Sequence, residues 1–145
     1  MLYSNQITIP ANTQGSAPTS TKIKLSLGFI HTIWLTFPPG CVGLVKIRML
    51  IDGHPFLPVH QDSYISGDGY TFPFPVMFEI TDEPMTLTVE AWNDDDTYNH
   101  SIQVIILVLP KELILPSGST EGILESLKTL VLRPIVIQQA ATEET

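Results

Sequence analysis

The stretch of sequence that decides the fold covers residues 85–109 and reads MTLTVEAWNDDDTYNHSIQVIILVL. In its first part Leu87, Val89 and Ala91 alternate with more polar residues, which is typical of a strand with one buried face. The polar cluster Asn93-Asp94-Asp95-Asp96 interrupts this pattern, and a second apolar run follows it. The stretch therefore predicts two antiparallel strands joined by a hairpin loop.

The second run, residues 99–109, is apolar on both of its faces. One face carries Ile102, Val104, Ile106 and Val108, and the other carries Ile105, Leu107 and Leu109. A strand that is apolar on both faces is normally covered on both sides. Because a single sandwich buries only one face of each sheet, we expect the C-terminal tail or a second subunit to cover the other.

Upstream of this stretch, short apolar runs are separated by turn residues. Residues 22–27 alternate cleanly, Gly28 indicates a bulge or bend, and the pattern continues over residues 29–37. Asp52-Gly53 is a strong turn signal. Residues 64–76 contain two prolines, which cannot donate to a strand ladder, so this segment is predicted to be an edge strand or a loop.

These patterns divide the chain into three parts. Residues 22–110 are predicted to form one all-β domain, an antiparallel sandwich of about seven to eight strands. Residues 1–21 are predicted to be an N-terminal arm, with a short strand at Ile7–Ile9 and a stretch over 10–21 that is rich in small and polar residues. Residues 111–145 are predicted to hold a linker, a short helix and a polar C-terminal tail.

The helix in the last part is predicted from apolar residues at helical spacing, among them Leu124, Leu127 and Leu130. Small hydroxyl residues and Glu121 mark its start, and Arg133-Pro134 marks its end. We expect its apolar face to contact other protein surfaces.

The composition excludes two classes of partner. The chain has 145 residues, of which seven are basic and fifteen acidic, and its formal charge is −8. So few cations cannot hold a nucleic-acid backbone, and no apolar run reaches the roughly 18 residues that a membrane helix needs. We therefore expect a globular protein, made in a reducing cytoplasm, whose partners are neither nucleic acid nor membrane.

The charge is unevenly placed along the chain. Residues 1–51 contain four cations and no carboxylate, a sum of +4, whereas residues 52–145 carry three cations and fifteen carboxylates, a sum of −12. Copies of the chain could meet through this complementary charge, although folding can also interleave the two parts.

Patterns that would support catalysis or metal binding are weak. Cys41 has no partner cysteine, so it excludes an internal disulfide and is expected to be a small buried hydrophobe. His54 and His60 with Asp62 lack the tight His-x-His pairing of metal-binding cupins, and Asp94–Asp96 lacks EF-hand spacing. We expect no catalytic residue, no metal and no cofactor.

Two further alternatives stay open. Glu79 and Glu90 fall on strands expected to be neighbours, as the carboxylate pair of a glycosidase would, but nothing else selects them. A sugar-stacking platform would draw on six aromatic residues: Trp34, Trp92, Tyr64, Tyr70, Phe72 and Phe74. Tryptophans at the ends of a sandwich are more often interface anchors, and we predict that role for Trp34 and Trp92.

Five short segments within residues 22–110 carry a family resemblance. They are Ile30-His31-Thr32-Ile33-Trp34, Phe37-Pro38-Pro39-Gly40-Cys41, Tyr64-Ile65-Ser66-Gly67-Asp68, Glu90-Ala91-Trp92-Asn93 and Asn99-His100-Ser101. Together they resemble small β-sandwich proteins of tailed bacteriophage virions, in particular the capsid auxiliary proteins known as cement or decoration proteins.

The resemblance implies a jelly-roll-like domain that forms a dimer or trimer, lies on the outer surface of the virion and binds the major capsid protein lattice. The residues predicted to form its interfaces are Trp34, Trp92, Ile105, Leu107, Leu109, Leu124, Leu127 and Leu130. The alternative is a fibre, baseplate or other carbohydrate-binding module that recognises a host-surface glycan. A tail or neck connector would share the fold.

Overall fold

The runs of alternating residues form β-strands in the computed structural model, which describes residues 1–114. The elements are β1 (Leu2–Ile9), β2 (Thr19–Leu25), β3 (Gly28–Phe37), β4 (Val45–Ile51), β5 (His54–Leu57), β6 (Ile65–Ser66), β7 (Tyr70–Ile80), β8 (Met85–Asn93), β9 (His100–Leu109) and the helix α1 (Lys111–Ile114). The predicted all-β antiparallel sandwich is confirmed. The helix expected around Leu124, Leu127 and Leu130 lies outside the described residues. No helix within the described part of the chain is long and apolar enough to cross a membrane.

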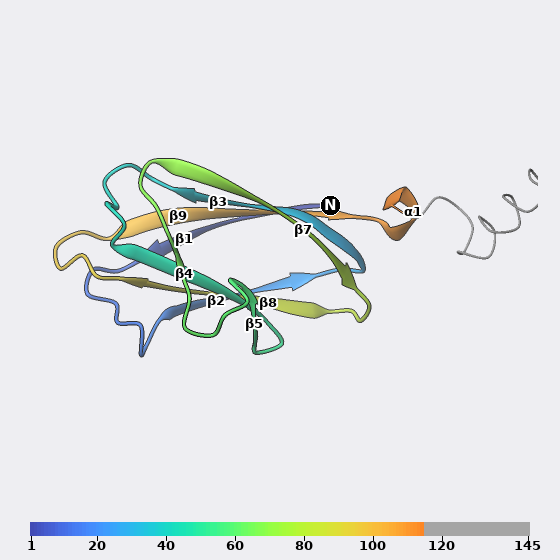
Figure 1. The fold of residues 1–145 in the computed structure, drawn as a ribbon, viewed down its shortest axis with the longest axis horizontal. Helices are drawn as coiled ribbons and strands as arrows, with labels where there is room; N and C mark the ends of the chain where they lie inside the picture. The colour runs from blue at the N-terminus through green and yellow to red at the C-terminus, as the bar shows by residue number, and fades with distance from the viewer. Residues whose placement is uncertain (115–145) are drawn as a thin grey trace, which may run out of the picture. The chain divides into compact units, whose positions relative to one another are not determined.

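Two antiparallel sheets form the two layers of the sandwich (Figure 1). Sheet A has the strand order β1-β9-β3-β7, and sheet B has the order β2-β8-β4-β5, with β6 also paired to β4. The pairing is nested, because β1 pairs with β9, β2 with β8, β3 with β7 and β4 with β5. A long two-stranded ribbon wound into two sheets in this way is a jelly roll, so the strand order agrees with the expected jelly-roll-like fold.

The loop between β8 and β9 crosses from one sheet to the other, so the predicted hairpin is wrong. β8 pairs with β2 and β4 in sheet B, whereas β9 pairs with β1 and β3 in sheet A. Residues 22–37 likewise separate into β2 and β3 in opposite sheets. At that crossing Gly28 has φ +144°, and a Cβ atom would lie 2.4 Å from the Leu109 carbonyl oxygen, so only glycine fits.

The N-terminal residues belong to the sandwich, which corrects the arm expected over residues 1–21. β1 pairs with β9 along its whole length, and Ile7 and Ile9 are buried in the core. The loop after β1 is also held, because the Asn93 amide donates to the Thr13 carbonyl over 2.9 Å. The small and polar residues over 10–21 that suggested an arm instead form the loop after β1 and the start of β2.

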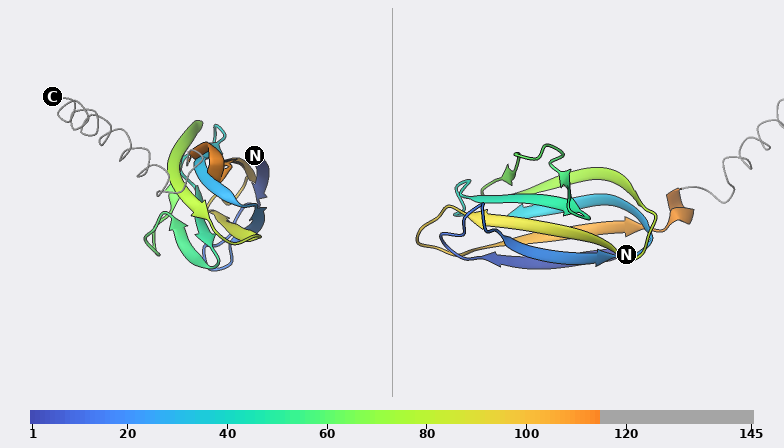
Figure 2. Two further views of the ribbon diagram at one scale, coloured as in Figure 1. Left: turned by 90° about the vertical axis from the view of Figure 1, so that its right-hand side faces the viewer. Right: turned by 90° about the horizontal axis from the view of Figure 1, so that it is seen from below.

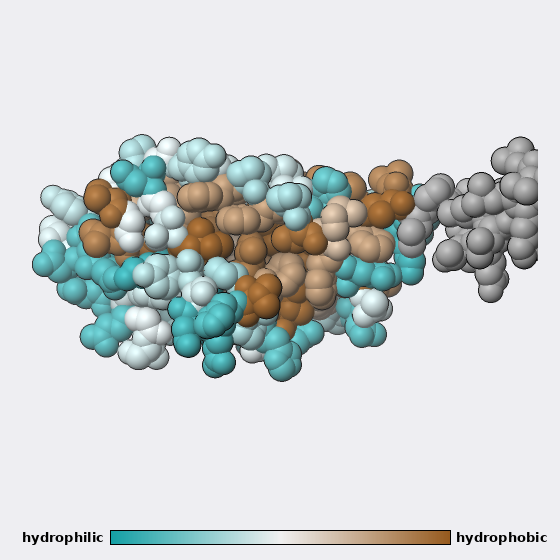
Figure 3. All heavy atoms as spheres, in the orientation of Figure 1, coloured by the Kyte–Doolittle hydropathy of each residue, from teal (hydrophilic) through white to brown (hydrophobic). Residues whose placement is uncertain are grey.

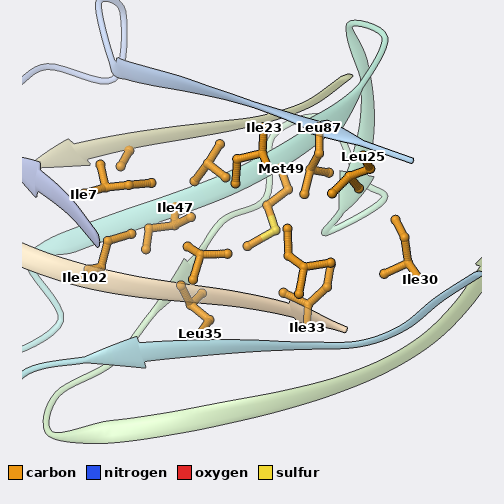
Figure 4. Packing of buried hydrophobic residues seen from close by; sticks show 14 of the residues in the cluster. Ile7, Ile23, Leu25, Ile30, Ile33, Leu35, Ile47, Met49, Leu87 and Ile102 are labelled. Atoms are coloured by element: carbon orange, nitrogen blue, oxygen red, sulfur yellow. The ribbon is translucent and has the colours of Figure 1, made fainter. Parts of the chain in front are cut away.

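The core fills the space between the two sheets with aliphatic side chains (Figure 4). They include Ile7, Ile23, Leu25, Ile30, Ile33, Leu35, Ile47, Met49, Leu87 and Ile102. Val89 and Ala91 are buried beside Leu87 as predicted, and Cys41 is a buried thiol. The core thus takes one face of every long strand and leaves the opposite faces to solvent or partners.

On one side of the sandwich, aromatic side chains close the gap between the edges of the two sheets. Phe56 of β5 and Phe78 of β7 meet edge to face with ring centroids 5.2 Å apart, and Phe72 and Phe74 pack against the core from the same edge. Figure 3 shows hydrophobic residues gathered in a band along this side. The segment 64–76, predicted to be an edge strand or a loop, supplies most of β7, the edge of sheet A.

Candidate functional site

The outer face of sheet A carries a patch of apolar side chains that point away from the core. Ile105, Leu107 and Leu109 of β9 alternate with fully buried residues and are themselves only partly buried. Their cross-strand neighbours are also apolar, with Trp34 opposite Ile105, Leu2 opposite Leu107 and Phe29 opposite Leu109. We name these six residues the apolar outer patch. Leu2 is the most open of them, with 65% of its surface exposed.

The rest of the same face is mostly polar and uncharged, except at one end, where Glu79 lies opposite Phe29 and pairs with Lys111. Thr36 and Thr71 share a hydrogen bond of 2.9 Å between β3 and β7, and Thr8 and Ser101 share one of 2.8 Å between β1 and β9. The Gln103 amide donates to Ser4 Oγ over 3.3 Å. The apolar outer patch is therefore bordered by hydroxyl and amide groups, the arrangement of core and rim found in protein–protein interfaces.

A bulge in β3 shapes the centre of this face. Against β9 the pairing shifts between Ile30, opposite Val108, and Thr32, opposite Leu107, so His31 is the extra residue on β3. His31 Nδ1 lies 2.8 Å from Thr32 Oγ1, so the two side chains satisfy each other beside Leu107. The bulge thus lets one strand keep Ile30 and Ile33 in the core while turning polar atoms toward the face.

The outer face of sheet B is charged instead. All four cations of residues 1–51 lie on its strands β2 and β4, namely Lys22, Lys24, Lys46 and Arg48. Arg48 Nε donates to Glu90 Oε2 over 2.6 Å, and Lys46 pairs with Asp94, a hydrogen bond that raises the pKa of Lys46. Because β8 runs between β2 and β4 (Figure 2, right), all three strands belong to one sheet. The four cations that the sequence concentrates in residues 1–51 therefore lie together on the outer face of sheet B.

Two aromatic rings lie among these cations. Trp92 and Tyr64 meet edge to face with centroids 5.8 Å apart. The Lys46 ammonium lies 5.0 Å from the Tyr64 centroid, and the Arg48 guanidinium lies 5.8 Å from the Trp92 centroid. Gly15 also approaches Trp92, since an added Cβ would lie 3.4 Å from the indole. These contacts hold both rings in place on the charged face.

The acidic loop between β8 and β9 is a structural crossing. The buried Asn93 side chain donates to the Tyr98 carbonyl over 2.9 Å and accepts from the Asp95 amide over 3.0 Å. Asp95 accepts from the Thr97 and Tyr98 amides and lies 2.8 Å from His100 Nε2. These bonds, the Thr97 amide first, lower the pKa of Asp95. Asp95 and Asp96 therefore accept hydrogen bonds from within the loop, while Asp94 pairs with Lys46.

The remaining candidates for chemistry are not brought together. Glu79 lies on the outer face of sheet A, paired with Lys111 at 2.9 Å, whereas Glu90 lies in sheet B, so the expectation that their strands are neighbours is wrong. Within residues 1–114, no three His, Cys, Asp or Glu side chains are grouped so that they could hold a metal ion. Burial, with the Asp68 and Asp95 charges, raises the pKa of the Cys41 thiol and disfavours the reactive thiolate.

The residues predicted to form interfaces separate into two sets. Trp34, Ile105, Leu107 and Leu109 come together in the apolar outer patch, whereas Trp92 lies on the opposite outer face of the sandwich. Leu124, Leu127 and Leu130 lie outside the described residues.

Leu2 and Phe29 were missed, and so was the placement of Lys46 and Arg48 against Tyr64 and Trp92. Only the alternation of Phe29 with Ile30 offered a signal for them, since the other neighbours depend on sheet pairing.

Comparison with known proteins adds little. No family model matches the sequence, and no curated protein matches it. One solved structure, described as the crystal structure of FLHE, matches 73% of this chain and 94% of its own chain, with 13% sequence identity and a TM-score of 0.36. At this TM-score the likeness carries no argument about fold or function.

Proposed function

We propose that this protein is a non-enzymatic structural protein that binds the major capsid protein lattice of a tailed bacteriophage as a cement or decoration protein. The observation that supports the proposal is the apolar outer patch on sheet A, where Trp34 lies opposite Ile105. Buried aromatic anchors surrounded by apolar neighbours supply most of the binding energy of protein interfaces. Trp34 also belongs to one of the segments that carry the family resemblance.

The surroundings of the patch favour a protein partner. Thr36, Thr71, Ser101 and Gln103 offer uncharged donors and acceptors around it, and the one charged group beside it, Glu79 opposite Phe29, is paired with Lys111. A stable interface buries about 1,600 Å² in total, which one face of a domain of this size can supply. Jelly rolls occur in viral capsid and lectin domains alike, so the fold is compatible with this role without selecting it.

The test is co-sedimentation of the purified protein with expanded capsids assembled from the major capsid protein of the same genome. We expect Leu107→Lys to reduce occupancy about tenfold or more, because it places a charge in the centre of the contact. Thr88→Lys, a charge added to the outer face of sheet B, is the matched control and should bind as the unmodified chain does. Absence of co-sedimentation by the unmodified chain would overturn the capsid role.

The second candidate function is recognition of an acidic glycan through sheet B. The observation that favours it is the Trp92–Tyr64 pair held between Lys46 and Arg48, since aromatic faces stack on sugars and cations pair with carboxylates or sulfates. A glycan array distinguishes the two candidates. Binding that Trp92→Ala removes and Leu107→Lys leaves unchanged would favour the glycan module over the cement protein.

A further inference from the structure

Most of the strand edges in the described part of the chain carry features that prevent pairing with another strand. β2, one edge of sheet B, presents Lys22 and Lys24. β7, one edge of sheet A, contains Pro73 and Pro75, and β5 contains Pro55 and is only four residues long. Lysines, prolines and short strands are the usual means by which proteins block edge-to-edge association.

β1, the other edge of sheet A, has none of these features. Its eight residues, Leu2–Ile9, contain no proline and no charged side chain, and its pairing with β9 continues without a shift in register. Exposed, regular and uncharged edges of this length are templates for strand addition.

The free hydrogen-bonding groups of β1 can be assigned to particular residues. Met1 and Val108 exchange both of their backbone hydrogen bonds, and such pairs alternate along an antiparallel ladder. Tyr3, Asn5, Ile7 and Ile9 are therefore bonded to β9. The N–H and C=O groups of the alternate residues point off the edge of the sheet, and these residues are Leu2, Ser4, Gln6 and Thr8.

We propose that β1 pairs antiparallel with β1 of a second copy of this chain across a two-fold axis. The register that uses every outward-pointing group sets Leu2 opposite the partner's Thr8 and Ser4 opposite the partner's Gln6. A second copy fits because the edge is uncharged and self-complementary, which a symmetric dimer contact requires. The two four-stranded A sheets then form one continuous sheet.

This pairing rests on the β1 edge alone and does not depend on the proposed function. Where both hold, the dimer presents its two apolar outer patches on the same side of the joined sheet. Two patches in one molecule bind a lattice of repeated subunits by avidity, without any new contact. Failure of the pairing would leave the capsid contact of a single patch untouched, and the reverse is also true.

The first test is the oligomeric state of the full chain, measured by sedimentation velocity over a range of concentrations. We expect a dimer that the double variant Ser4→Lys with Gln6→Lys weakens about tenfold or more, because lysines then face each other across the new ladder. Ser4→Lys with Gln6→Glu is the matched control, since it sets opposite charges face to face and should restore the dimer. A monomeric unmodified chain, or equal weakening by both double variants, would overturn the proposal.

The second test needs no variant and so does not depend on the folding of one. Amide hydrogen exchange of the unmodified chain should show slow exchange at Asn5 and Ile7 at every concentration, because these amides are bonded to β9. The amides of Ser4 and Gln6 should exchange slowly only at concentrations where the dimer forms. Fast exchange at Ser4 and Gln6 at all concentrations would contradict the pairing.

Discussion

The two outer faces of the sandwich differ although the strands beneath them are alike. Both sheets bury the same kind of aliphatic residues on their inner sides. Outside, sheet A presents Trp34, Ile105 and Leu107 with a hydroxyl and amide rim, whereas sheet B presents Arg48 paired with Glu90 and further cations. The difference teaches that the inner faces specify the fold, while the outer faces are free to specify partners.

The two faces also differ in the kind of free energy that a contact would gain, which is burial of apolar surface on sheet A and attraction between charges on sheet B. The apolar face of sheet A gains free energy by removing surface from water, an effect of about 25 cal/mol per Å² that salt does not screen. Contacts between charges on sheet B weaken as ionic strength rises, since the screening length is about 8 Å at physiological salt. Sheet A is thus suited to a stable contact, and sheet B to a reversible one.

The largest expected effect tests the difference between the inner and the outer side chains of β9, which alternate along this strand. Ile106→Ala removes a fully buried side chain, and we expect it to lower the free energy of unfolding by about 2–5 kcal/mol. Leu107→Ala, one residue later on the outer face, should cost about 1 kcal/mol, because this side chain is only partly buried. Urea denaturation of the two variants measures the difference. Equal costs would mean that the patch is part of a closed core and is not an available surface.

A smaller effect sharpens the contrast in charge. A double-mutant cycle of Arg48→Ala and Glu90→Ala should give a coupling energy of about 0.5–1 kcal/mol at low salt, because both side chains are partly exposed. This coupling should fall when salt is added. The matched cycle on sheet A, Thr36→Val with Thr71→Val, removes a hydrogen bond between neutral groups and should give a coupling that salt leaves unchanged. Salt dependence in both cycles, or in neither, would remove the distinction between the faces.

The smallest effect lies in the loop that joins the two sheets. The amides of Thr97 and Tyr98, with His100, lower the pKa of Asp95 below its ordinary value of 3.8. Because the folded-state pKa is lowered, Asp95 stabilises the fold at pH values above about 3.8, and this contribution is lost as the pH falls through the lower folded-state pKa. Asp95→Asn should therefore flatten the acid side of the stability profile, measured by thermal unfolding across pH. An unchanged acid slope would show that the loop does not depend on the charge.

Strand positions were largely predictable because alternation reports directly on burial. Residues 85–93 contain Leu87, Val89 and Ala91 at inward positions, and all three are buried in the structure. The turn at Asp52-Gly53 was also predictable, since both residues have positive φ there and this dipeptide favours that conformation.

Strand neighbours were not predictable. The polar loop after β8 suggested a hairpin, yet β8 and β9 lie in different sheets, because loop composition is similar whether a chain turns back or crosses over. Residues 1–21 were taken for an arm because residues 10–21 are small and polar, yet β1 pairs with β9 along its whole length, and this pairing is decided by distant parts of the chain.

The residues of the candidate site were likewise predicted only in part. The residues of β9 that point outward, Ile105, Leu107 and Leu109, were found from the sequence because a second apolar face is conspicuous. Leu2 and Phe29, which complete the apolar outer patch, were not found, since their place beside β9 depends on pairing between distant parts of the chain.

By itself the sequence determined most of the strand positions within residues 22–109, which faces of these strands are apolar, and that the stretch 85–109 contains two strands separated by a polar loop. Only the tertiary structure decided that these two strands lie in opposite sheets, that the apolar second face of β9 meets Trp34 and Leu2, and that β1 is an edge strand of sheet A among the described residues. The physical reason is that the side-chain pattern is a local property of the sequence. The backbone hydrogen-bonding groups are the same in every strand, so long-range packing decides which strands pair.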